Sequence, residues 1–386
     1  MKKNGLPFRC GVVCPNYGLV GGAERFVFEL TERLAEREYF EMHVFANKWR
    51  AGGDNVIFHK VPMIRFPRWA RPVSFAIFVQ KAIKSGKFDI VHSHERLFGY
   101  DFLTHHGLPH KTWVQVIRNK RLSLFDRATA RIEEMGINSA DLPVIMPVST
   151  IGKNELLKLF DIPESRIQMI HPGITLKKFA ELDKEKCRQE VRMYLGLSLD
   201  DVVLLFVGMN FETKGLERIL KGVSVFTEGG SKYSELKLLV VGKGNRRKYL
   251  SMARSLKIDD RIIFAGTIHD VEKHFLASDL VVLMSYLEPF GIVILEAMAA
   301  GLPVIISDTV GARDVVESGV TGYIVNGESL EREMAGSLSV LMDQERRRKM
   351  GENAKRKAAG HDWDIVAEQV AGLYIRRVVD KRKLFS

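Results

Sequence analysis

Short apolar runs alternate with amphipathic helical segments along most of the chain, and this alternation limits the possible folds more than any other feature. In the first half, the runs predicted to be strands are residues 9–14, 41–46, 90–92, 143–148 and 166–170. In the second half they are residues 202–207, 237–241, 261–264, 280–283, 303–307 and 323–325, and helical patterns fill residues 216–226, 246–256, 271–277 and 291–300. Strands that are apolar throughout and alternate with helices are typical of parallel sheets covered on both faces. The sequence therefore predicts an α/β protein.

A chain of 386 residues is too long for one ordinary hydrophobic core, so we expect more than one domain. The boundary is predicted near His171-Pro172-Gly173, which gives a first domain of residues 1–171 and a second of residues 172–363. The last residues, 364–386, are predicted to form a basic helix that packs back on the first domain.

Basic charge is concentrated in one part of the chain. The net charge is +11, and residues 60–131 contain 14 Lys and Arg against 4 Asp and Glu. Such a concentration indicates an anionic partner, which could be a membrane surface, a phosphorylated substrate or nucleic acid, unless the stretch is only a solvated face.

No apolar run reaches the roughly 18 residues that span a bilayer, and no signal peptide is recognised. The three cysteines form no CxxC motif. These features predict a cytoplasmic protein.

The most informative stretch runs from Glu288 to Ile306. It predicts a strand, a loop holding Glu288, a helix that starts near Gly291 and a new strand after Pro303. The free backbone N–H groups at such a helix start attract an anion such as phosphate. A carboxylate at Glu296, about a turn and a half along the helix, can accept hydrogen bonds from the two hydroxyls of a ribose. Open α/β sheets bind ligands at this edge, where Glu288 also lies.

This stretch resembles the E-x7-E signature of the retaining glycosyltransferases of family 4. The resemblance covers nearly the whole chain and includes further segments: Gly21-Gly22-Ala23-Glu24, Asp89-Ile-Val-His-Ser-His94, Thr104-His-His-Gly107, Ile170-His-Pro-Gly-Ile174, Val207-Gly-Met-Asn-Phe-Glu-Thr-Lys-Gly215 and Val241-Gly-Lys-Gly244. It implies a GT-B fold, in which two Rossmann-like parallel-sheet domains face each other across a cleft. It also implies that Glu296 binds the ribose and that Glu288 contacts the donor sugar and acts in catalysis, with Phe290, Gly291 and Ile292 completing this part of the donor site.

Lys214 is the one basic residue of the motif that follows the first strand of the second half. The family neutralises the donor pyrophosphate with an Arg after the strand glycine and with this Lys, but here the Arg position is Met209. Lys214 is therefore predicted to bind the phosphates and to act in catalysis. Lys243 or Arg313 could supply a second positive charge; otherwise phosphate binding is weaker.

Two features of the first half match the family's active site. Gly22, in the Gly21-Gly22 pair before the first helix, is predicted to let a phosphate or the acceptor approach the backbone. His106 matches the family's histidine that faces the donor sugar and is the predicted catalytic group, with His105 and His94 as weaker candidates. The histidine spacing, without a cysteine or carboxylate partner, does not favour a metal site.

Asp362-Trp363-Asp364 has the form of a DxD motif, which binds a metal and nucleotide in the other large glycosyltransferase fold. That role requires a loop at a strand end, whereas this segment precedes the predicted terminal helix. We therefore interpret it as a helix cap and a packing residue, and expect neither a metal nor another cofactor.

Bulky apolar and basic residues are interleaved in residues 64–78 and 110–131. The pattern suits an interfacial helix on anionic lipid, and a helix with one face in the core is the alternative. No helix-turn-helix, RNP or zinc-finger pattern supports nucleic-acid binding.

Taken with the resemblance, these residues imply transfer of a hexose, with UDP-glucose as the expected donor, to a hydroxyl of a glycolipid or lipopolysaccharide-type acceptor, with retention of configuration. The first-domain features look similar to lipopolysaccharide-core glucosyltransferases, which act at the inner face of the cytoplasmic membrane. Stabilisation of the leaving group would be the main catalytic effect, since no pair of carboxylates that would flank the anomeric carbon is identifiable.

The alternatives are a nucleotide-sugar epimerase of the same fold and a non-catalytic lipid- or carbohydrate-binding module. A nicotinamide-dependent dehydrogenase would require a G-x-G-x-x-G motif that residues 10–22 do not contain.

Overall fold

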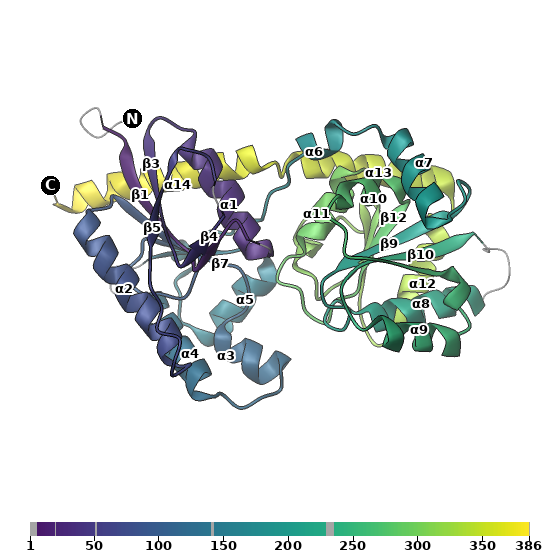
Figure 1. Ribbon diagram of the computed structural model, residues 1–386, viewed down its shortest axis with the longest axis horizontal. Helices are drawn as coiled ribbons and strands as arrows, with labels where there is room; N and C mark the ends of the chain where they lie inside the picture. Colours follow the sequence, from purple (N-terminus) through teal and green to yellow (C-terminus); the bar gives the residue numbers. More distant parts are fainter. Residues whose placement is uncertain (1–5, 20, 51, 140–142, 229–234, 386) are drawn as a thin grey trace. The chain divides into compact units, whose positions relative to one another are not determined.

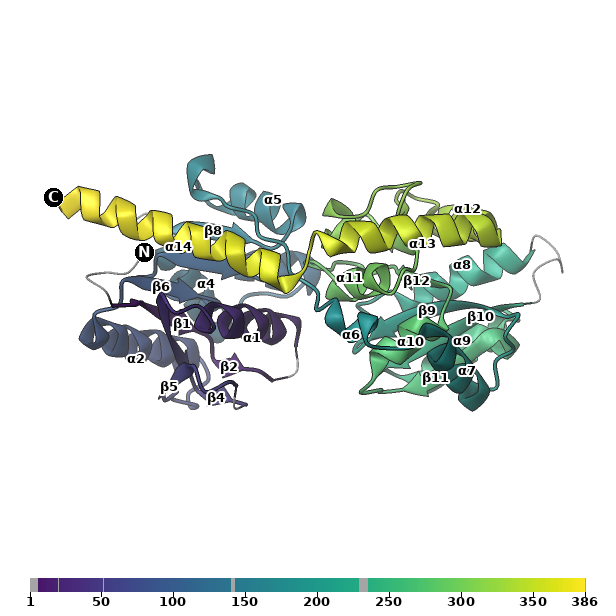
Figure 2. The same ribbon diagram turned by 90° about the horizontal axis from the view of Figure 1, so that it is seen from above.

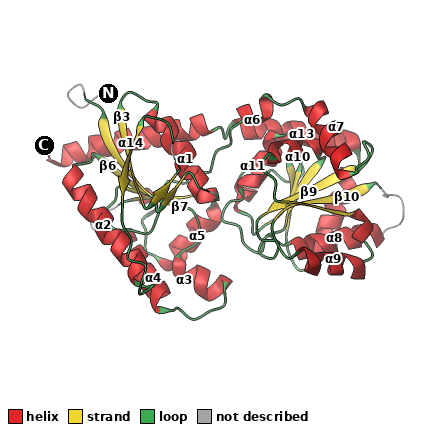
Figure 3. Cartoon of the chain, in the orientation of Figure 1, coloured by secondary structure: helices red, strands yellow, loops and turns green. Residues whose placement is uncertain are grey.

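The computed structural model describes residues 6–385 apart from residues 20, 51, 140–142 and 229–234. The chain forms two compact units, the first comprising Met1–Gly173 with Trp363–Ser386 and the second Ile174–Asp362 (Figure 1). Each unit is built on one six-stranded sheet, with helices packed on it (Figure 3). The prediction of an α/β protein with two parallel sheets is therefore confirmed. Within the part of the chain that is described, no helix is long and apolar enough to cross a membrane.

The sheet of the first unit is parallel throughout. Its strands, in spatial order, are β5 (Val56–Lys60), β3 (Phe40–Ala46), β1 (Phe8–Val13), β6 (Ile90–Ser93), β7 (Phe102–His105) and β8 (Val144–Pro147). A separate short ladder joins β2 (Asn16–Tyr17) to β4 (Lys48–Trp49). The helices are α1 (Gly22–Ala35), α2 (Ala70–Gly86), α3 (His110–Thr112), α4 (Leu124–Ile137), α5 (Thr150–Leu159) and α14 (Trp363–Phe385).

Neighbouring residues of β6 show what covers each face of this sheet, because successive side chains of a strand point to opposite faces. Val91 belongs to a buried apolar cluster with side chains of α2 and α4, among them Phe75 and Ile132. His92 lies on the other face, where its Nδ1 is 2.6 Å from the hydroxyl of Tyr374 on α14. Helix α14 also packs on α1 through the Phe26 and Trp363 rings, and its course is visible in Figure 2.

The sheet of the second unit is also parallel throughout. Its strands are β11 (Ile262–Gly266), β10 (Leu236–Gly242), β9 (Val202–Gly208), β12 (Leu280–Leu283), β13 (Val304–Ser307) and β14 (Gly322–Val325). The helices are α6 (Lys177–Ala180), α7 (Lys184–Leu195), α8 (Leu216–Glu228), α9 (Arg246–Ser255), α10 (Val271–Ala277), α11 (Ile292–Ala299), α12 (Leu330–Leu341) and α13 (Gln344–Ala359). Strands β9 and β10 pair along their whole length, so that Gly208 and Gly242 lie side by side at the carboxyl edge.

Two local predictions were wrong. Residues 166–170 are not a strand: they donate two backbone hydrogen bonds to β8, but only Ile167 forms a bridge, with Ile145. Residues 110–131 do not form one helix. A π-helical turn (Trp113–Ile117) follows α3, Asn119 has a φ of +47°, and Ser123 caps a new helix, α4, through a reciprocal pair of hydrogen bonds with Asp126. The cap and the left-handed residue divide the segment.

Candidate active site

Lys214 and Glu288 form an ion pair at the carboxyl edge of the second sheet. Lys214 lies in the loop after β9, and Glu288 lies in the loop after β12, the neighbouring strand. The carboxyl ends of parallel strands meet at one edge of a sheet, so two loops that are distant in sequence are brought together there. Both side chains are largely buried, with exposed fractions of 26% for Lys214 and 14% for Glu288. The two charged side chains therefore lie at the edge where open α/β sheets bind their ligands.

The loop that carries Lys214 is held by its backbone. The Asn210 side chain accepts hydrogen bonds from the backbone N–H groups of Glu212 and Thr213, and the N–H of Lys214 donates to the Asn210 carbonyl at 3.0 Å. Gly215 has a φ of +74°, and a Cβ at this position would collide with the carbonyl oxygen of Met284. Glycine is therefore required where the loop approaches the end of β12, and this approach places Lys214 beside Glu288.

The loop that carries Glu288 is tied to the loop after β13. The N–H of Glu288 donates to the carbonyl of Thr309 at 3.0 Å, and the carbonyl of Glu288 accepts from the N–H of Gly311 at 2.9 Å. Phe290 is buried, and its carbonyl accepts from the N–H of Ala312 at 2.7 Å. The two loops thus form one structure that fixes the position of the Glu288 side chain.

Helix α11 begins directly after Gly291, which has a φ of +92°. Ile292 and Val293 are its first residues and are partly exposed, so the helix start is open to solvent. The backbone N–H groups of a first helical turn have no carbonyl partners within the helix and favour an anion. Glu296 lies further along α11 with an exposed fraction of 8%. The predicted donor-site residues of this stretch, Glu288 to Glu296, are therefore gathered at one edge of the second unit with Lys214.

The residues around this edge show whether another cation takes the place of the arginine that the family has at position 209. Met209, at that position, is 56% exposed. Of the two residues considered as replacements, Arg313 donates to the backbone carbonyl of Asp308 at 2.9 Å, whereas Lys243 is exposed just after β10. Arg218, one turn after Lys214, lies over the Tyr286 ring at 3.8 Å and also contacts the end of β12. It therefore supports the loop structure.

A pocket of about 310 Å³ lies beside these loops at the carboxyl ends of β9, β10 and β11. Its lining includes Phe211, Phe264 and Arg246, whose guanidinium lies 5.6 Å above the Phe264 ring. No single linear motif indicates this pocket, because its residues come from three separate loops.

In the first unit, His106 follows β7 and His94 follows β6. The Nε2 atom of His106 is 3.0 Å from Nδ1 of His94, and the rings are stacked with centroids 5.3 Å apart. The edge of the Phe26 ring, one turn after Gly22 on α1, contacts His106 at 4.9 Å between centroids. Burial, reinforced by the charge of His105, lowers the pKa of His106 to about 3. His106 is therefore a neutral imidazole at physiological pH.

The other histidines of this region have structural partners. His105 contacts Glu133 at 3.3 Å, and Glu133 also accepts from Arg96 at 2.8 Å. Burial alone would raise the pKa of Glu133, but its hydrogen bond with His105 and the charge of Arg96 lower it to about 2. His92 bonds Tyr374 and Thr104. These contacts assign His105 and His92 to the core of the first unit.

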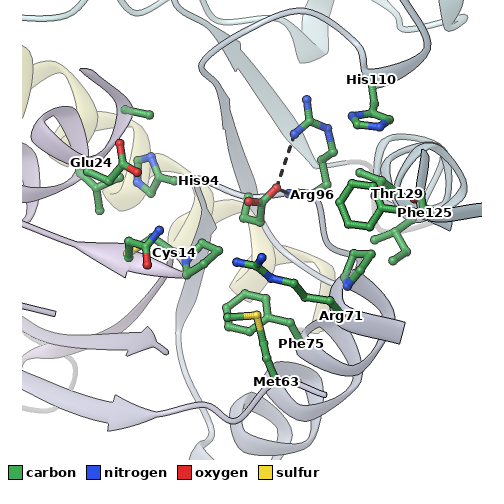
Figure 4. A pocket seen from close by; sticks show the side chains of 17 residues that line it. Cys14, Glu24, Met63, Arg71, Phe75, His94, Arg96, His110, Phe125 and Thr129 are labelled. Atoms are coloured by element: carbon green, nitrogen blue, oxygen red, sulfur yellow. Dashed lines mark hydrogen bonds and ion pairs between the residues drawn. The ribbon is translucent and has the colours of Figure 1, made fainter. Parts of the chain in front are cut away.

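A larger pocket, of about 340 Å³, lies within the first unit and is shown in Figure 4. We call it the first-unit pocket. It is formed by the segments that follow β1 and β6, by α1, and by the starts of α2 and α4. In Figure 4, Glu24 and His94 lie on one side and Arg71 extends into the pocket from the other. Its walls come from seven separate stretches of chain, so no local sequence motif indicates this pocket.

The Asp362-Trp363-Asp364 segment has structural contacts. Trp363 is fully buried and begins α14, and Asp364 accepts a hydrogen bond from Arg33 at 2.7 Å. Backbone hydrogen bonding joins His361 to Ile174 at 2.8 Å. The segment is a junction between helices α13 and α14.

Comparison with known proteins identifies the kind of enzyme to which these sites belong. The fold is similar to that of WaaG, described as a glycosyltransferase involved in lipopolysaccharide biosynthesis, with a TM-score of 0.79, 22% sequence identity, and coverage of 95% of this chain and 99% of that chain. The family model "Glycosyltransferase Family 4" matches residues 20–178, and "Glycosyl transferases group 1" matches residues 188–357. This chain is a glycosyltransferase of the GT-B type.

Two curated relatives of this glycosyltransferase match along most of their length. The D-inositol 3-phosphate glycosyltransferase of Thermobispora bispora is 28% identical over 396 residues, which cover 93% of this chain and 91% of the relative. The N-acetyl-alpha-D-glucosaminyl L-malate synthase of Bacillus anthracis is 25% identical over 376 residues, which cover 91% and 92%. The glycosyltransferase is thus similar to enzymes whose names specify different acceptors.

Proposed function

We propose that this glycosyltransferase moves a hexose from a UDP-sugar, with UDP-glucose as the expected donor, to a hydroxyl of a glycolipid of lipopolysaccharide type with retention of configuration. The bond between the anomeric carbon and the β-phosphate oxygen breaks, and UDP leaves with its electron pair. A bond forms between the anomeric carbon and the acceptor oxygen, and the acceptor hydroxyl passes its proton to the departing diphosphate.

The Lys214–Glu288 pair beside the start of α11 is the observation that carries this proposal. In the proposed complex, Lys214 and the N–H groups of α11 bind the donor pyrophosphate. Negative charge on this group increases as UDP leaves, so preorganised donors and a cation stabilise the transition state more than the ground state. Glu288 orients Lys214 and contacts the donor sugar, while buried Glu296 accepts hydrogen bonds from the ribose.

The pocket beside β9, β10 and β11 is the proposed site of the nucleobase. Phe211 and Phe264 offer aromatic surface for a planar ring, and backbone groups of Gly244 and Gly266 line the same space. In the first unit, His106 is the proposed catalytic group that faces the sugar. Because the pKa of His106 is lowered to about 3, it would act as a neutral hydrogen-bonding group and not as a cation.

The test of this function is incubation of the protein with a panel of nucleotide sugars, with and without lipid acceptors, while free nucleotide and product are measured. We expect acceptor-dependent release of UDP, and activity that survives EDTA because protein charge neutralises the pyrophosphate. Release of UDP with an altered sugar and no acceptor would instead show an epimerase. Binding without any turnover would show a non-catalytic module. Activity that EDTA abolishes and Mg²⁺ or Mn²⁺ restores would contradict the role of Lys214.

A second candidate function follows from the two curated relatives. Inositol 3-phosphate and L-malate, which their names specify, are small hydroxyl compounds and not lipids. A water-soluble hydroxyl acceptor is therefore the competing possibility, and the panel includes these two compounds beside the lipid acceptors. Transfer to them, with no transfer to lipid, would favour this second function.

We also propose that the first unit docks on the inner face of the cytoplasmic membrane. Large apolar side chains are exposed before α2 and from α3 to the first residue of α4: Ile64, Phe66, Trp69, Trp113, Val116, Ile117 and Leu124. The guanidinium of Arg68 lies 5.0 Å above the Phe125 ring, which places these two stretches next to each other. We call these side chains, with the exposed Lys and Arg residues between them, the apolar–basic surface. Such a composition favours an anionic lipid interface.

Replacing Arg118, Lys120 and Arg121 together with Gln is expected to reduce sedimentation with anionic vesicles. All three side chains are exposed, and each basic residue near an anionic leaflet contributes about 1 kcal/mol within a Debye length of roughly 8–10 Å. Sedimentation of the wild type should also fall as salt rises.

The matched control replaces Arg346, Lys349 and Arg356, which are exposed on α13 of the second unit, with Gln. This variant has the same change in net charge and should sediment like the wild type. Equal losses in both variants, or a wild type that does not bind anionic vesicles at low salt, would contradict docking through the apolar–basic surface.

A further inference from the structure

None of the residues assigned above to the donor site lines the first-unit pocket, and its lining indicates the chemistry of a second ligand. It lies at the carboxyl ends of β1 and β6, where open α/β sheets bind ligands. Its volume of about 340 Å³ is at the lower end of the range for small-molecule sites, which is roughly 300–1,000 Å³. Apolar side chains of α1, α2 and α4 form one part of the wall, and charged or polar side chains form the other. This combination suits a compact ligand with both hydroxyls and charge.

Two arginines reach this pocket, and only one of them is already paired. Arg96 donates to Glu133 at 2.8 Å, lies 3.5 Å from a carboxylate oxygen of Glu95, and donates to the carbonyl of Leu108. The guanidinium of Arg71 forms no hydrogen bond or ion pair with a residue of the described ranges, and Figure 4 shows it extending into the pocket beside Phe75. Arg71 is therefore the cation that is available to an anionic ligand. A planar guanidinium can bind two oxygens of a phosphate or carboxylate at once.

The opposite wall offers groups that bind hydroxyls. The Glu24 carboxylate lies over Gly21 in the first turn of α1 and forms no ion pair with a described residue. The Nε2 atom of His94 is buried and has no hydrogen-bond partner among the described residues, whereas Nδ1 of the same ring bonds His106. Burying a polar atom without a hydrogen-bond partner costs free energy, so a ligand hydroxyl that bonds Nε2 of His94 would remove this cost. Both Glu24 and His94 line the pocket and are labelled in Figure 4.

The pocket also adjoins the apolar–basic surface. Exposed Trp69 lies just before Arg71 at the start of α2, and exposed Leu124 lies just before the pocket-lining Phe125 at the start of α4. The starts of α2 and α4 thus supply apolar side chains to the apolar–basic surface, and the residues that follow them line the pocket. A ligand with a polar head and an apolar part could place the head in the pocket and the apolar part over this surface.

We propose that the first-unit pocket binds the head of the acceptor, that this head carries a phosphate or carboxylate held by Arg71, and that its hydroxyls bond Glu24 and His94. This inference rests on the proposed function only in calling the ligand the acceptor. The pocket's selectivity for anionic sugars is a property of the first unit alone, and it is measured without a donor.

The experiment measures binding of three probes to the full chain by calorimetry: glucose, glucose 6-phosphate and glucuronate. They share a sugar ring and differ in carrying no charge, a phosphate or a carboxylate. We expect one or both anionic probes to bind at least about tenfold more tightly than glucose, because hydrogen bonds to charged groups are the stronger ones. The order of the two identifies phosphate or carboxylate as the group that Arg71 holds.

Arg71→Gln should remove this preference and leave the affinity for glucose unchanged, and Arg71→Lys should retain part of it. Glu24→Gln should weaken all three probes. The matched control is Lys81→Gln, an exposed residue further along α2 that does not line the pocket, and its binding should equal that of the wild type. Melting temperatures of all variants verify that α2 is intact.

The proposal is overturned if neither anionic probe binds better than glucose, or if Lys81→Gln and Arg71→Gln have equal effects. In the second case, only the general positive field of the first unit would act. Failure of the proposed function has a different signature: no nucleotide is released from any donor, while the Arg71-dependent preference for anionic sugars persists.

Discussion

Lys214→Ala should lower kcat by about 100- to 1,000-fold, the range observed when one group that stabilises developing negative charge is removed from an active site. Lys214 is the cation paired with Glu288 beside the start of α11, and the position of a second family cation is occupied by Met209. The measurement is steady-state turnover with the donor identified in the nucleotide-sugar panel. Glu288→Ala should lower turnover as well. In the double variant the loss should be smaller than the product of the two single losses, because the pair acts as a unit.

Lys221→Ala is the matched control for this experiment. Lys221 is on α8, close in sequence to Lys214, and its exposed side chain pairs with Glu217 at 2.9 Å. Exposed pairs of this kind contribute little to stability, so turnover should be unchanged. A loss of less than about threefold in Lys214→Ala would mean that other groups carry the phosphate charge, and Lys243 would be the next residue to test.

Glu296→Gln is expected to weaken UDP binding by about 10- to 150-fold, the equivalent of roughly 1.5–3 kcal/mol for hydrogen bonds to a charged group. The substitution keeps the shape of a side chain that is only 8% exposed, so the loss should reflect the missing charge and not a cavity. Calorimetry with UDP gives the affinity, and the melting temperature of the variant shows whether α11 is preserved.

Glu352→Gln serves as the control for this second experiment, since Glu352 is exposed on α13 and pairs with Arg348 at 2.6 Å. Its affinity for UDP should match that of the wild type. If Glu296→Gln binds UDP as tightly as this control, Glu296 does not contact the ribose, and its role is confined to packing in α11.

The central strands of both sheets could be predicted from sequence because they are buried on both faces and therefore apolar throughout. Strand β12 (Leu280–Leu283) is an example, since all four of its residues are buried. Strand β5 (Val56–Lys60) was not predicted, because it lies at the edge of its sheet and mixes polar with apolar residues. Strand β7 (Phe102–His105) was also missed, since two of its four buried positions are Thr104 and His105, which read as polar in the sequence.

The same distinction applies to the candidate sites. Glu288, Gly291 and Glu296 lie on one continuous strand–loop–helix segment, so their spacing alone placed them at one sheet edge. The ion pair between Lys214 and Glu288 joins positions 74 residues apart and required the parallel pairing of β9 and β12. The first-unit pocket depends on the packing of α2 and α4 against the sheet, and no local pattern in the sequence specifies which of their side chains face it.

Helix α14 has a consequence for the order in which the protein is made. It belongs to the first unit, and its Tyr374 bonds His92 across a sequence separation of 282 residues, while Trp363 packs on Phe26. A ribosome therefore releases all of the first sheet, and then the whole second unit, before it supplies the helix that covers one face of that first sheet. The second unit is built from residues 174–362 alone, so all of its elements are synthesised before α14. Domains generally fold as units during synthesis, N-terminal ones first, and distant pairings slow folding. In this chain the half that is synthesised first is the half that is completed last.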